Sequence, residues 1–156
     1  MTTLTGACRS IRTVMEANVP DNPETGGPSI VYRWKDEDGP PLPDTPAPFV
    51  YTVFTALRSD AIEIGGGRGA NRHRNPGEAN IFVFVPRTWS QPYATDLAEH
   101  FAKLFRSYRA NGVTVDSATV YPGGQGSEIA VPGMDNEANN YIWAGCGLSF
   151  YFDLTG

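Results

Sequence analysis

The sequence predicts an α+β protein: a mostly antiparallel β-sheet packed by two helices and joined by long Gly/Pro-rich loops. Residues 141–152 alternate between an apolar set and a mixed set with a period of two, which is typical of a half-buried strand. Residues 4–18 and 95–110 instead repeat apolar side chains at helical spacing. The 17 Gly and 13 Pro among 156 residues indicate many turns and loops.

Length and composition predict a single domain over residues 1–156, large enough to form a core without disulfide or metal cross-links. The net charge of -5 argues against nonspecific nucleic-acid binding as the main activity. Two cysteines, Cys8 and Cys146, are too few for a disulfide framework. No signal peptide and no apolar stretch of membrane-spanning length is recognisable, so we expect a soluble protein made in a reducing cytoplasm.

In the first half of the chain, Thr3 or Thr5 caps the expected helix 4–18, and Pro20 ends it. A short strand is expected over 30–34. The segment 35–48 holds five prolines and four acids, which predicts an exposed loop unable to pack a core.

Two apolar strands are expected next. Residues 49–58 are largely apolar on both faces, which predicts a central strand, and 61–64 either extends it or starts another element. The segment 65–77 is expected to be loop because of its glycines. A buried strand over 81–85 is stopped by Pro86.

In the second half, Thr95 or Asp96 is expected to cap the helix 95–110, and Asn111-Gly112 to form its C-cap. A strand over 113–121 follows, with a bulge near Asp116-Ser117, and 122–140 is expected to be loop. The expected sheet core and the helix residues packed over it are Val53, Phe82, Phe84, Leu148, Phe150, Phe152, Phe101, Leu104 and Phe105.

Four basic residues, Arg68, Arg72, His73 and Arg74, lie close together in the expected loop 65–77. One interpretation is a solvated hairpin tip. The other is a mobile basic loop that meets an acidic surface or nucleic acid, which the acidic balance of the remaining chain favours. On the final strand, Tyr141, Trp143 and Tyr151 share the face opposite the apolar set and are candidates for contact with another subunit.

No motif indicates an enzyme. GGGRGA at 65–70 matches a loose dinucleotide-binding pattern, but the residues after it break rather than start a helix. His73 and His100 lie far apart without zinc-type spacing, and no nucleophile elbow occurs. We therefore expect no catalytic residues, no cofactor and no metal.

The order of several stretches resembles the tail terminator (tail completion) proteins of long-tailed bacteriophages and phage-like gene transfer agents. The matching stretches are FVYTVFTALRSD, IFVFVPRTW, LAEHFAKLF, RANGVTVDSATVYPGG and SFYFDL, within about residues 48–153. Gly112-Val113 and Asp153 match features of that family. The loops 35–48 and 122–140 look expanded relative to compact members.

The resemblance implies a virion structural protein, assembled in the host cytoplasm and placed at the head-tail interface. It implies a ring, typically hexameric, that stops tail-tube polymerisation and presents a surface to the head-completion or connector protein. Partners would be other copies, the tail tube protein and the connector, with genomic DNA only passing through the lumen and no membrane. Alternatives are another connector ring, the tube protein itself, or a small-molecule-binding enzyme.

Overall fold

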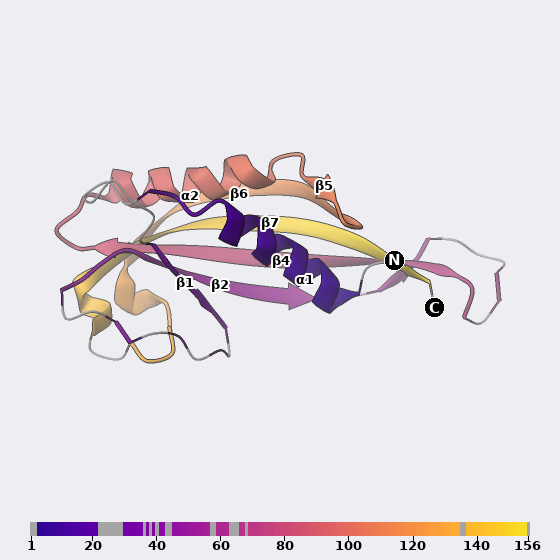
Figure 1. Ribbon diagram of the computed structural model, residues 1–156, viewed down its shortest axis with the longest axis horizontal. Helices are drawn as coiled ribbons and strands as arrows, with labels where there is room; N and C mark the ends of the chain where they lie inside the picture. Colours follow the sequence, from indigo (N-terminus) through magenta and orange to yellow (C-terminus); the bar gives the residue numbers. More distant parts are fainter. Residues whose placement is uncertain are drawn as a thin grey trace.

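The computed structural model describes residues 3–21, 30–35, 37, 39, 41–42, 45–56, 59–62, 66–67, 69–134 and 137–155. These residues form a curled, mostly antiparallel sheet of seven strands with two α-helices on one face (Figure 1). The predicted α+β class is therefore confirmed.

The strands lie in the order β1-β2-β4-β7-β6-β5, and β3 pairs with β4 outside this path. Only the β1–β2 pair among the described strands is parallel. The elements are α1 (Leu4–Ala17), β1 (Val31–Trp34), β2 (Phe49–Ala56), β3 (Asp60–Ala61), β4 (Arg72–Pro86), α2 (Gln91–Phe105), β5 (Arg109–Ala110), β6 (Val113–Gln125), the 3-10 helices η1 (Gly126–Glu128) and η2 (Glu137–Asn140), and β7 (Tyr141–Thr155).

The two longest strands, β4 and β7, form the centre of the molecule. They pair in one continuous antiparallel register, from Arg72 opposite Thr155 to Pro86 opposite Tyr141. The start of β4, the end of β7 and the short β3 project beyond the helices as an arm (Figure 1). The molecule is therefore elongated, with two separate ends.

Both helices cover the same face of the sheet, as their apolar stripes require. The N-cap of α1 is Thr3, whose hydroxyl accepts a hydrogen bond from the Gly6 N–H at 3.1 Å, one of the two predicted caps. This helix-facing core contains residues from α1, α2 and the sheet, among them Ala7, Ile11, Met15, Val50, Ile81, Val83, Phe101, Phe105, Cys146, Leu148, Phe150 and Phe152.

A second apolar cluster lies on the opposite face, at the end of the sheet away from the arm. Its buried members are Phe49, Tyr51, Phe84, Val131, Met134, Ala138 and Tyr141. The predicted core was therefore wrong in one respect. Val53, Phe82 and Phe84 are part of this second cluster, whereas Phe150 is part of the helix-facing core. Successive strand residues point to opposite faces, and Phe84 and Phe150 have opposite orientations in the paired register.

The apolar cover of this second cluster comes from segments that were expected to be loop. Leu42, from the proline-acid segment, packs against it, as do Ile129 and the buried Val131, Met134 and Ala138. The expectation that 35–48 cannot contribute to a core was therefore wrong for Leu42. The segment 122–140 is partly strand and partly 3-10 helix.

The boundaries of α2 differ from the expected ones at both ends. The helix starts at Gln91, with Ser90 as N-cap and a proline in the first turn, and it ends at Phe105. Asn111 and Gly112 instead form the two-residue turn of the β5–β6 hairpin, with φ values of 54° and 77°. Both residues need positive φ in this turn type, which explains the Asn-Gly pair. The predicted bulge in β6 is confirmed between Val115 and Ser117.

Candidate assembly surface

The predicted basic loop is a strand over most of its charged residues. Arg72, His73 and Arg74 belong to β4 and pair with Thr155, Leu154 and Asp153 of β7. The expectation of loop over 65–77 was therefore wrong from residue 72 onward, because pairing with β3 on one side and β7 on the other outweighs the local composition. Arg68 lies outside the described residues.

Asp153 of β7 holds the two strand arginines on the helix-free face. Arg74 donates from Nε to Oδ1 at 3.0 Å and from Nη2 to Oδ2 at 3.1 Å, a bidentate pair. Arg72 donates from Nη2 to Oδ2 at 2.7 Å. The hydrogen bonds from Arg74, and then from Arg72, lower the pKa of Asp153 to about 2. Because His73 alternates with these arginines along the strand, it points to the other face.

This ion-pair network lines a hollow of about 330 Å³, and a third arginine also lines it. Arg109 of β5 reaches it because β5 pairs with β6 through Thr114, and Thr114 pairs with Tyr151 of β7. The Arg74 guanidinium lies 4.1 Å above the Tyr151 ring, which fixes its orientation. We call this site the basic hollow; its charged residues are Arg72, Arg74, Arg109 and Asp153.

Arg109 was expected near the end of the helix 95–110, but it lies in β5 and lines the basic hollow. The Asn-Gly pair that follows it is a strong hairpin signal and would have placed Arg109 in a strand. Asp153 was noticed only as a match to a family feature. No local pattern links it to arginines so distant in sequence.

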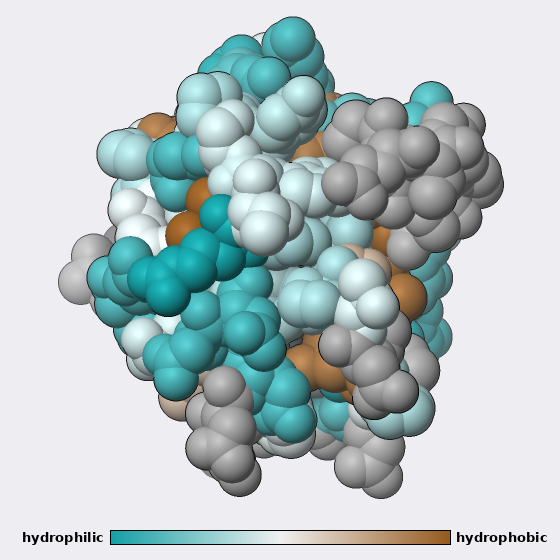
Figure 2. All heavy atoms as spheres, turned by 90° about the vertical axis from the view of Figure 1, so that its left-hand side faces the viewer, coloured by the Kyte–Doolittle hydropathy of each residue, from teal (hydrophilic) through white to brown (hydrophobic). Residues whose placement is uncertain are grey.

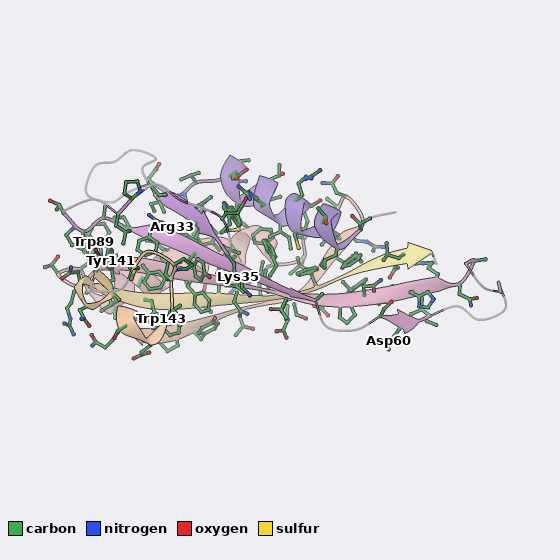
Figure 3. All side chains as sticks on the ribbon, turned by 90° about the horizontal axis from the view of Figure 1, so that it is seen from below. Arg33, Lys35, Asp60, Trp89, Tyr141 and Trp143 are labelled. Carbon is green, nitrogen blue, oxygen red and sulfur yellow. The ribbon has the colours of Figure 1, made fainter. Side chains whose placement is uncertain are left out.

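The three aromatic residues of the predicted interface face have different surroundings. Tyr141 is 1% exposed, covered by the chain's own second cluster. Trp143 is half-buried between Phe82 and Tyr121, and its Nε1 donates to Glu128 at 3.3 Å. Tyr151 lies in the basic hollow at the other end of the strand. Figure 3 places Tyr141 and Trp143 at one end of the sheet and Asp60 of the arm at the other.

Another hollow, of about 610 Å³, lies between α1 and the strands β1 and β2. Arg12 crosses it and forms ion pairs with Glu16 at 3.0 Å and Glu37 at 2.6 Å. The same guanidinium lies 4.4 Å from the Trp34 ring. Burial raises the pKa of the neighbouring Cys8 thiol, which disfavours the nucleophilic thiolate.

The part of the chain that the structure describes offers neither a metal-ligand cluster nor a membrane-spanning helix. Three or more His, Cys, Asp or Glu side chains do not gather there in a way that could hold a metal ion. Neither described helix is long and apolar enough to cross a membrane. No protein-family model matches the chain, and no curated protein matches its sequence.

The Asp153 network leads to a pH-dependent prediction. The pKa of Asp153 in the folded protein, about 2, is lower than the ordinary value of 3.8, so folding favours the carboxylate. The stabilisation is present above about pH 4 and is lost as the pH falls towards 2. Since both arginines are partly exposed, Asp153→Asn should cost about 1–2 kcal/mol of unfolding free energy at pH 7.

Urea unfolding at pH 7 and pH 2 measures this contribution. The difference in unfolding free energy between wild type and Asp153→Asn should shrink at the lower pH. Asp116→Asn, at an exposed position of β6, is the matched control. A difference that stayed constant between the two pH values would contradict the ion-pair account.

Proposed function

We propose that the protein is a structural subunit of a phage-type virion that forms a ring on the head-proximal end of the tail tube. The ring ends tube growth and forms the joint to the head connector. In this proposal the ring contains six copies, its partners are the tail tube protein and the connector, and DNA passes through its lumen. It rests on the resemblance of the successive sequence stretches to tail terminator proteins.

The observation that supports this proposal best is the elongated sheet with two different ends. One end carries the second apolar cluster and the acidic 3-10 helices, and the other carries the projecting arm and the basic hollow. A closed ring needs a heterologous contact, in which each subunit offers two different patches. A subunit with two chemically distinct ends meets this requirement.

A cap is distinguished from a tube subunit by what it does at the tube end. A closed ring presents a finite number of matching patches, so a terminator stops at rings, whereas a tube subunit polymerises by itself. The other virion rings share the requirement for heterologous contacts but would not bind the end of a tube. If the protein were instead a small-molecule-binding enzyme, a ligand should bind in the hollow between α1 and the sheet.

Negative-stain imaging of the purified protein, with and without tail tube subunits, tests the proposal. We expect rings of uniform diameter, and tubes that remain short and end in a ring when the protein is present. The control is the same tube preparation without the protein, which should grow long. Long tubes formed by the protein alone, or tubes unaffected by it, would contradict the proposed role.

A further inference from the structure

The outer edge of β6 is open along most of its length. β5 pairs with this strand only through Val113 and Thr114, at its start. One more backbone hydrogen bond follows, in which the Val115 N–H donates to the Tyr108 carbonyl at 2.9 Å. In the part of the chain that the structure describes, no further strand pairs with the outer side of 117–124. An unpaired strand edge is a template for pairing with another chain.

Pro122 lies on this open edge, with its backbone nitrogen turned outwards. The Val115 N–H faces β5, so Val115 and Phe150 of β7 form a pair without hydrogen bonds between them. After the bulge the register runs without a break as far as Pro122, which pairs with Ala144. Ala144 and Phe150 are an even number of residues apart on one strand, so their backbone groups face the same side. Pro122 therefore replaces an N–H that would point away from β7, a position where an edge strand tolerates proline.

Pro122 also lies near the middle of the stretch that a second copy of β6 could reach. β5 already lies beside the start of β6, so pairing is confined to 117–125, after the bulge. If two copies of this stretch pair antiparallel about a twofold axis, Pro122 of each copy lies opposite Val120 of the other. Each such pair would have one hydrogen bond instead of two, because proline has no N–H. The Val120 carbonyl would then remain without a donor.

We infer that Pro122 prevents copies of this chain from joining through their β6 edges. The register shifts between Val115 and Ser117 and between Pro122 and Gln125 shorten the regular backbone on both sides, which opposes pairing further. Figure 2 views the molecule from the end where β6 leads into η1, and much of the coloured surface there is hydrophilic. The open backbone, and not a large apolar patch, is therefore what a second strand would bind there. The inference does not rest on the proposed function.

Pro122→Thr tests the inference in the full chain, because it restores the outward N–H at an exposed position of β6. Threonine also favours strand structure. We expect self-association about tenfold or more tighter than that of the wild type. Sedimentation at about 0.15 M salt measures it, since salt screens the repulsion between copies that each carry a net charge of -5. Thr119→Val is the matched control: it changes an exposed side chain of the same strand without adding a backbone donor and should behave like the wild type.

A second change separates edge pairing from other causes of association. Lysine on an edge strand opposes pairing, so adding Thr119→Lys to Pro122→Thr should restore the behaviour of the wild type. Association of Pro122→Thr equal to that of the wild type would overturn the inference and leave the proposed function intact, and so would association that Thr119→Lys does not reverse. Circular dichroism should show that Pro122→Thr folds like the wild type. Loss of the fold would contradict the outward placement of the Pro122 nitrogen and with it the inference.

Discussion

Replacing Phe150 with alanine should lower the free energy of unfolding by about 3–5 kcal/mol. The Phe150 side chain is 1% exposed, on the sheet face covered by the helices. It packs over Gly77 on the neighbouring strand so closely that a Cβ at Gly77 would lie 2.6 Å from the Phe150 Cζ. Surrounding atoms cannot easily fill the cavity left by alanine, so the loss is a large share of a domain's stability.

Chemical denaturation of the purified variant measures this loss. Tyr93→Ala, which truncates an aromatic side chain that is 49% exposed, is the control and should change stability far less. Phe84→Ala, in the second cluster on the opposite face, should cost a similar amount to Phe150→Ala, because Phe84 is 0% exposed and stacks on Phe49 at 4.7 Å. An unchanged stability in Phe150→Ala would contradict the register of β7.

The elements that the sequence predicted well are those with a strong local period. The alternation in 141–152 predicted β7, and the structure extends this strand to Thr155. The helical spacing of apolar residues over 4–18 predicted α1; of these residues Ala7, Ile11 and Met15 are buried, whereas Leu4 is exposed. These patterns are local, so they can be recognised without knowledge of the partner strand.

The first half of β4 could not be predicted in this way. Its sequence, RHRNPG, contains charges, a proline and a glycine, and no local pattern favours a strand. It becomes one because β7 pairs along its whole length and because Asp153 forms ion pairs with Arg72 and Arg74. These contacts join residues far apart in sequence, and the basic hollow depends on them.

The second cluster was missed for a related reason. Alternation shows that a strand has two faces, but it does not show which face meets the helices when both carry large apolar side chains. Leu42, Val131 and Met134, which cover the second face, are isolated apolar residues in Gly/Pro-rich segments. Their role follows from the fold of the sheet and not from their own neighbourhood.

If the proposed function holds, the largest functional effect should come from making virions without this protein. Under the proposed function, tube subunits would continue to add to an uncapped end, and the connector would have no surface to join. We therefore expect tails of abnormal length and tails that are not attached to heads. Supplying the wild-type protein from a second copy of its gene is the control and should restore normal particles.

The length distribution of tails in particles made without the protein, measured by electron microscopy, tests the proposed function most directly. The account predicts a broad distribution with many tails longer than normal, together with free heads. Tails of normal length joined to heads would contradict it and would favour one of the other classes of protein.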